Sequence, residues 1–310
     1  MDNENLGVFF AGNYLLQGNQ FEKCRKAAKL NAGCMELVAK TDKINYDIKS
    51  INNLKDNYKG NIFFHLPSVN PDLSNLKIIN EIARNLKLSG IELVTINASN
   101  LSLDLFEWST LEEQKKYFLN IVTSIATIAS NKIEVAIDNM LYQEGNSVFG
   151  CNISQITDVI VYSRKMLIKD FGFKESETEK YIGLALNIDN IDTNSDREKL
   201  ENWLEVYRDS IKCIKISDIN KIDDINLILD YSKNRNTKIL LKTKSDLDEI
   251  DTEYYNLLNY VNKDESMYIS VDKQSVSEIK RNKKYSNYII IGIIVITVVI
   301  LYLMLIYKLR

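Results

Sequence analysis

Seven short apolar segments of the chain each carry one polar residue close to their carboxyl end. These residues are Glu36, His65, Asn97, Asp138, Asn187, Lys215 and Lys242. If the segments are strands of a parallel α/β barrel, inward-facing residues at their carboxyl ends line the mouth where such barrels place their active sites. Carboxylate, imidazole, amide and ammonium groups gathered there could bind a small polar ligand, hold a cation or exchange protons.

The elements that would position these residues follow from the alternation of strand-like and helical patterns. Runs of branched and aromatic apolar residues predict strands at residues 7–10, 34–39, 61–66, 93–97, 134–139, 182–188, 211–217 and 238–241. Helical patterns lie between them and include residues 21–30, 73–89, 109–130, 154–170, 196–208 and 246–261. Several of these open with Ser or Asp, whose side chains accept hydrogen bonds from the first helical turn.

Eight strand–helix units within residues 1–261 predict an α/β fold, a (β/α)8 TIM barrel. A doubly wound open sheet is the structural alternative. The period-two pattern favours the barrel: in the fifth strand Val135 and Ile137 would face the helices, while Ala136 and Asp138 face inward. The last three strands alternate in the same way.

Four motifs occur in order on the third, fifth, sixth and seventh predicted strands. They are Phe64-His-Leu-Pro67, Ile133-Glu-Val-Ala-Ile-Asp-Asn-Met140, Tyr181-Ile-Gly-Leu-Ala-Leu-Asn-Ile-Asp-Asn190 and Cys213-Ile-Lys-Ile-Ser-Asp218. From about Leu6 to Val261 the chain thereby resembles the xylose isomerase-like TIM barrels. These include sugar phosphate isomerases and epimerases and enzymes of the endonuclease IV type.

The resemblance implies a divalent metal held by Glu, Asp, His and Glu on the fifth to eighth strands. The corresponding positions here are Asp138, Asn187, Lys215 and Lys242, and two further family histidines fall on Asn190 and Asn97. An ammonium has no lone pair to offer a metal, so only Asp138 keeps ligand chemistry. We therefore expect no metal cofactor, with Asp138 as a remnant of the site. A residual Mg²⁺ site built from Asp138, Asp189 and Asp218 is the alternative.

The two lysines admit two interpretations. Glu36, Asp138, Lys215 and Lys242 sum to zero charge, so the ring could neutralise itself and serve structure alone. Alternatively, one lysine could replace the metal as an electrophile, binding an anionic group or forming a Schiff base if its pKa is depressed by the other. The candidates for catalysis are thus His65, Lys215 and Lys242. His65 has no partner visible in the sequence, which favours a hydrogen-bonded core residue over a general acid or base.

The composition and motif content of the chain argue against several classes of function. The chain has 39 basic and 42 acidic residues and a pI near 5.5, without the basic excess of a nucleic-acid-binding protein. Cys24, Cys34, Cys151 and Cys213 are far apart and form no zinc-binding pairs, so we expect free thiols, buried where they fall in strands. The sequence contains no phosphate-binding loop and no nucleophile elbow.

The carboxyl-terminal sequence predicts a membrane anchor. Residues 288–307 form an uncharged apolar run flanked by tyrosines, and at about 1.5 Å per residue it spans about 30 Å, a bilayer core. Residues 262–287 read as a polar, basic tether and residues 308–310 as a short basic tail. Four basic residues precede the run and two follow it, which favours a cytoplasmic amino-terminal domain.

These patterns predict a membrane-anchored barrel that has lost its metal ligands and acts as a non-catalytic module. Its partners would be the membrane and a small polar or anionic ligand or a protein, bound at the mouth. The alternative is a sugar (phosphate) isomerase, epimerase or lyase with altered or absent metal dependence.

Overall fold

The computed structural model describes residues 5–10, 20–39, 47–141, 147–191, 197–217, 225–235, 237–243 and 254–259. The chain divides into a first unit, Met1–Tyr255, and a second, Asn256–Arg310, of which only residues 256–259 are described, as helix. The predicted tether, membrane segment and basic tail lie outside the described residues. Within the described ranges, no helix is long and apolar enough to cross a membrane.

Eight parallel strands close into a barrel in sequence order, and β1 pairs with β8 to complete it. The strands are β1 Leu6–Phe10, β2 Cys34–Val38, β3 Asn61–Leu66, β4 Leu93–Asn97, β5 Glu134–Asp138, β6 Ile182–Asn187, β7 Ile211–Ile216 and β8 Lys238–Thr243. All eight predicted strands are confirmed, with ends shifted by at most two residues. The closed barrel excludes the open-sheet alternative.

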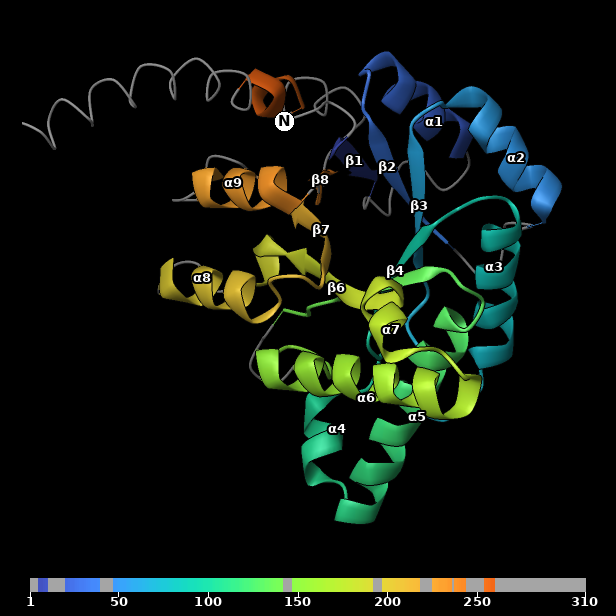
Figure 1. Ribbon diagram of the computed structural model, residues 1–310, viewed down its shortest axis with the longest axis vertical. Helices are drawn as coiled ribbons and strands as arrows, with labels where there is room; N and C mark the ends of the chain where they lie inside the picture. Colours follow the sequence, from blue (N-terminus) through green and yellow to red (C-terminus); the bar gives the residue numbers. More distant parts are fainter. Residues whose placement is uncertain are drawn as a thin grey trace, which may run out of the picture. The chain divides into compact units, whose positions relative to one another are not determined.

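Helices lie around the outside of the strands (Figure 1). They are α1 Gln20–Lys29, α2 Ile48–Asn57, α3 Leu76–Leu88, α4 Leu103–Trp108, α5 Leu111–Ala129, α6 Ile153–Phe171, α7 Glu175–Tyr181, α8 Arg197–Val206 and α9 Ile225–Arg235, with a 3-10 turn at Ile188–Asn190. Of these, α2, α4, α7 and α9 are not among the predicted ranges. The single helix predicted at residues 109–130 also begins later, at Leu111, after the separate short helix α4. Thr110 and Glu113 form a capping box that fixes this start.

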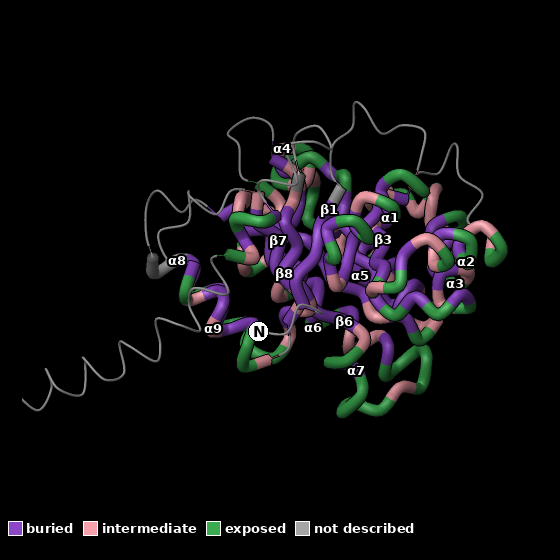
Figure 2. The backbone as a smooth tube through the Cα atoms, turned by 90° about the horizontal axis from the view of Figure 1, so that it is seen from above, coloured by how far each residue is buried: buried purple, intermediate pink, exposed green. Residues whose placement is uncertain are grey.

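A cluster of inward-facing side chains fills the barrel interior. Each strand contributes one residue to it: Phe9, Cys34, Phe63, Leu93, Ala136, Ala185, Cys213 and Leu240. The alternate residues of the strands, such as Val135 and Ile137, are buried under the helices. Figure 2 shows the strands as a buried core, with exposed residues on the surrounding helices. The predicted alternation is confirmed, so on β2 to β8 the next inward position along the strand faces the mouth.

The interior is tight where β1 meets β2. A Cβ atom added at Gly7 would lie 2.2 Å from the carbonyl oxygen of Cys34 and 2.4 Å from its sulfur. Gly7 therefore leaves room for the Cys34 side chain inside the barrel. All four cysteines are free, and Cys24, Cys34 and Cys213 are buried, as predicted for the strand cysteines. Burial raises the pKa of the Cys34 thiol to about 12.

Candidate functional site

The mouth is built around the ammonium group of Lys215, which β7 sends inward one layer above Cys213. Its Nζ lies 2.9 Å from Glu36 Oε1 on β2 and 2.8 Å from Asp138 Oδ2 at the end of β5. These atoms come from separate strands that only the closed barrel brings together. Lys215 is 1% exposed and Glu36 0%, so solvent screens neither pair appreciably.

Every N–H of the Lys215 ammonium has a partner. Besides the two carboxylates, it lies 3.2 Å from Thr95 Oγ1 on β4, and its Nζ is 4.6 Å from the centre of the Phe9 ring on β1. The Thr95 hydroxyl in turn donates to Glu36 Oε1. An ammonium offers three donors, so hydrogen bonding to Glu36, Asp138 and Thr95 uses all of them.

Electrostatics keep Asp138 and Lys215 ionised. Burial alone would raise the pKa of Asp138, but Lys215 and His65 outweigh it and hold that pKa below the usual range. Burial alone would lower the pKa of Lys215, but Asp138 and Glu36 together raise it above its ordinary value. A lysine nucleophile needs a depressed pKa, so the Schiff-base interpretation of Lys215 is disfavoured.

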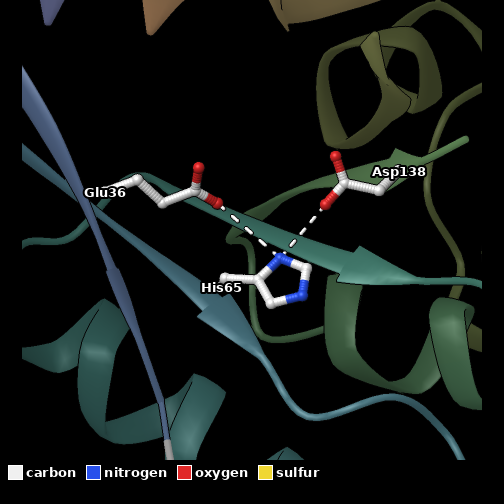
Figure 3. A group of neighbouring side chains, drawn as sticks. All are labelled: Glu36, His65 and Asp138. Atoms are coloured by element: carbon white, nitrogen blue, oxygen red, sulfur yellow. Dashed lines mark ion pairs between the residues drawn. The ribbon is translucent and has the colours of Figure 1, made fainter. Parts of the chain in front are cut away.

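His65 on β3 completes the cluster. Its Nδ1 lies 2.8 Å from Thr95 Oγ1, 3.1 Å from Asp138 Oδ2 and 3.7 Å from Glu36 Oε1. Figure 3 shows this nitrogen directed at the two carboxylates and the other ring nitrogen directed away from them. The side chain is 17% exposed, so it lies at the edge of the buried cluster. The structure thus supplies His65 with the partners that the sequence could not show.

Thr95 is the residue that the sequence analysis missed. It is fully buried and contacts Glu36, His65 and Lys215. The signal was present, because Thr95 lies two residues before Asn97 and period two puts both on the inward face of β4. The predicted site included only the last polar residue of each strand.

The three predicted asparagines form hydrogen bonds with residues outside the cluster around Lys215. Asn97 Nδ2 donates to Ser68 Oγ at 3.2 Å. Asn187 and Asn190 are both bound by Asn139, whose side chain pairs with the Asn187 backbone and whose carbonyl accepts from Asn190 Nδ2 at 2.6 Å. Asn139 follows directly on β5 and thereby ties the ends of β5 and β6 together.

Lys242 on β8 belongs to a second ion pair. Its Nζ lies 3.6 Å from Asp189 Oδ2, while Asp189 Oδ1 accepts from the backbone and hydroxyl of Ser217 at 3.2 and 2.6 Å. The two lysines therefore have separate counterions. Glu36, Asp138 and Lys215 sum to −1 when His65 is neutral, and Asp189 with Lys242 sums to zero. Of the alternative Mg²⁺ set, Asp218 lies outside the described residues.

The resemblance implies a divalent metal, and with Lys215 in place the residues at the mouth do not fit one. Within the described ranges, Glu36, His65 and Asp138 offer three ligand atoms that lie within 4.8 Å of one another. A metal bound to these oxygens at about 2.0–2.2 Å would overlap the volume that Lys215 Nζ fills. Glu36 Oε2 and Asp138 Oδ1 are buried and have no hydrogen-bond partner among the described residues.

A cavity of about 510 Å³ lies at the opposite, amino-terminal end of the strands. Its charged residues include Lys212 and Glu134, which form an ion pair at 3.4 Å, and Arg235 and Asp209, which pair at 3.9 Å. In TIM barrels this end carries stability rather than chemistry. The cavity therefore does not compete with the mouth as the candidate site.

Comparisons with solved structures agree on the fold. A D-tagatose 3-epimerase-like protein matches with a TM-score of 0.56 at 18% identity, covering 83% of this chain and 98% of that one. An L-ribulose 3-epimerase matches with a TM-score of 0.62 at 9% identity, covering 86% and 97%. An AP endonuclease of family 2 from Brucella melitensis matches with a TM-score of 0.56 at 10% identity, covering 77% and 92%.

The predicted (β/α)8 barrel is thus confirmed, and its fold is similar to those of sugar epimerases and of an AP endonuclease. At these identities the similarity extends to the fold alone. No protein-family model matches the sequence, and no curated protein matches it significantly.

Proposed function

We propose that this barrel binds an uncharged, sugar-like ligand at its mouth, without a metal cofactor and without converting the ligand. The observation that carries the proposal is the position of Lys215 Nζ between Glu36 Oε1 and Asp138 Oδ2. A divalent metal promotes isomerase chemistry by polarising a carbonyl oxygen. An ammonium whose donors are already used by protein oxygens has none left for a substrate carbonyl.

The charges at the mouth support an uncharged ligand over a phosphorylated one. Lys215 and Lys242 are both ion-paired. The formal charges of Glu36, Asp138 and Lys215 sum to −1 when His65 is neutral. A phosphate group would meet repulsion there rather than a free cation. Asn97 and His65 instead offer groups that can exchange hydrogen bonds with hydroxyls.

We further propose that residues 288–307 hold the barrel at the cytoplasmic face of a membrane. The support is the length and uniformly apolar character of that segment, together with the basic residues before it. Alkaline carbonate extraction of membranes from expressing cells tests this. Full-length chain in the soluble fraction would overturn it.

A second candidate function is a metal-independent isomerase or epimerase with His65 as the proton-transfer group. Asp138 and Thr95 contact one ring nitrogen of His65, and the other is directed away from the carboxylates (Figure 3). A histidine held in this way at one nitrogen can act as a general base through the other.

Sugar binding and turnover, measured on the same samples, separate the two candidates. The full-length chain, in mild detergent with EDTA, is titrated with D-tagatose, D-psicose, D-fructose and L-ribulose by calorimetry, and each mixture is then followed by NMR. Asn97→Ala and His65→Gln are compared with Asn53→Ala, a change on the exposed surface of α2.

The proposed function predicts binding of at least one sugar that weakens in Asn97→Ala, is unchanged in Asn53→Ala and yields no product. Conversion in EDTA that stops in His65→Gln would overturn the non-catalytic proposal and support the second candidate. If none of the sugars binds or reacts, both proposals fail.

A further inference from the structure

The buried acids at the mouth have more acceptor capacity than Lys215 can satisfy. Glu36 and Asp138 are 0% and 4% exposed. Each directs one oxygen at the ammonium and leaves the other, Glu36 Oε2 or Asp138 Oδ1, without a hydrogen-bond partner among the described residues. Buried carboxylate oxygens normally accept a hydrogen bond. Glu36 and Asp138 together could therefore balance more positive charge than one ammonium carries.

The same two acids belong to a set that could bind a cation. Glu36 on β2, His65 on β3 and Asp138 on β5 present one ligand atom each within 4.8 Å (Figure 3). Carboxylate oxygen and imidazole nitrogen are ligands for Mn²⁺, Co²⁺ and Zn²⁺. The resemblance predicts a different ligand set, on β5 to β8, which shares only Asp138 with this one.

We infer that Glu36, His65 and Asp138 form a divalent-cation site that the Lys215 side chain keeps closed. The ammonium is a cation tethered to β7 that contacts both carboxylates and lies over the Phe9 ring. Truncating Lys215 would leave the three ligands on their strands around an open volume. The inference concerns the same mouth as the proposed function but does not depend on a sugar ligand.

The test compares Lys215→Ala with Lys215→Met. Both substitutions remove the ammonium charge, but alanine opens the volume, whereas methionine fills most of it with an apolar side chain. Full-length proteins are expressed without added metal, purified in mild detergent, incubated with Mn²⁺ and desalted, and bound metal is measured by elemental analysis. Lys215→Ala with Asp138→Asn tests the ligand set.

We expect about one Mn²⁺ per chain in Lys215→Ala and less than about one tenth of that in the wild type, in Lys215→Met and in the double variant. The thermal midpoint of Lys215→Ala should rise with Mn²⁺ concentration, as binding to the folded state alone requires. Ethylammonium, which restores the missing ammonium as a separate molecule, should also raise that midpoint and should compete with Mn²⁺.

Three results would overturn the inference. One is stoichiometric metal in the wild type that disappears in Asp138→Asn, because the site would then already be open. Another is a folded Lys215→Ala protein that binds no metal. The third is a Lys215→Ala protein that stays unfolded even when Mn²⁺ or ethylammonium is present during refolding, because the three ligands could then not hold a cation.

Discussion

Removing the Lys215 charge while keeping its bulk should destabilise the barrel strongly. At an effective dielectric constant of about 20, two unit charges about 3 Å apart attract by about 5–6 kcal/mol, against a desolvation cost of several kcal/mol per buried ion. Lys215→Met loses two such attractions, at 2.8 and 2.9 Å, and leaves both acids in place. Removing one member of a buried ion pair typically costs about 3–5 kcal/mol, which we expect at pH 7.

The pH dependence gives this prediction its specific form. The pKa of Asp138 is lowered in the folded wild type, so its stabilisation is present above the ordinary value of 3.8 and is lost as pH falls through the lower folded value. The pKa of Lys215 is raised, so its stabilisation is present below 10.5 and is lost as pH rises through the higher folded value. These two groups therefore make no pH-dependent contribution to wild-type stability between about pH 5 and 9.

In Lys215→Met the sign of the Asp138 effect reverses. Buried carboxylates without a cation take up protons more readily when folded than when unfolded, so stability should fall as pH rises from 5 to 8. The limiting slope is about 1.4 kcal/mol per pH unit for each proton involved. The difference from the wild type should therefore be smallest at pH 5 and largest at pH 8.

Thermal unfolding followed by circular dichroism measures the effect on the full-length chain. For a domain of this size, about 1 kcal/mol corresponds to about 2–4 °C, so the midpoint at pH 7 should fall by about 6–20 °C. Adding Glu36→Gln and Asp138→Asn to Lys215→Met should recover more than half of that loss. A Lys215→Met midpoint within about 3 °C of the wild type, with an unchanged pH profile, would refute the electrostatic account.

Three further predictions concern the elements around this cluster. Thr95→Val keeps the side-chain shape but removes the hydroxyl that contacts Lys215, Glu36 and His65. The free energy of unfolding, measured by chemical denaturation, should fall by about 1–3 kcal/mol. An unchanged free energy of unfolding would show that the hydroxyl is dispensable. Gly7→Ala should lower the thermal midpoint by more than Gly172→Ala does. The Cβ added at Gly7 would lie 2.2 Å from the carbonyl oxygen of Cys34. The Cβ added at Gly172 would meet nothing within 4 Å, so only the φ of +71° at that position opposes alanine. A thiol reagent at pH 8 should label Cys151 first and reach Cys24, Cys34 and Cys213 only on unfolding, since those three are buried; rapid labelling of Cys213 would contradict the packed interior.

The strands could be predicted because inward-facing and helix-facing residues alternate along the sequence of a barrel strand. In β5, Val135 and Ile137 alternate with Ala136 and Asp138, and this pattern fixes both the element and its inward residues. The helices were harder to delimit. The start of α5 depends on the capping box of Thr110 and Glu113. This local signal is difficult to recognise within a long amphipathic pattern.

The charged residues at the mouth could be located from sequence, but Thr95 was missed and the pairing of the charges could not be predicted. Period two placed Glu36, Asp138 and Lys215 at the mouth, yet it does not say which strands face each other across a closed barrel. The separation of the two lysines, with Lys242 on Asp189, follows from the three-dimensional arrangement of β6, β7 and β8. The choice of Lys215, rather than Lys242, as the central cation therefore needed the structure.

The order in which the strands are synthesised sets a minimum waiting time for barrel closure. Gly7 on β1 pairs with Leu240 on β8, which is 233 residues later (240 minus 7). At about 5–20 residues per second, a ribosome needs roughly 10 to 50 s to supply that partner. During this interval one edge of β1 lacks its partner strand β8. Glu36 likewise lacks its ion-pair partner until Lys215, 179 residues downstream, has been synthesised. A nascent chain with an open strand edge and an uncompensated acid is a natural substrate for chaperones during translation.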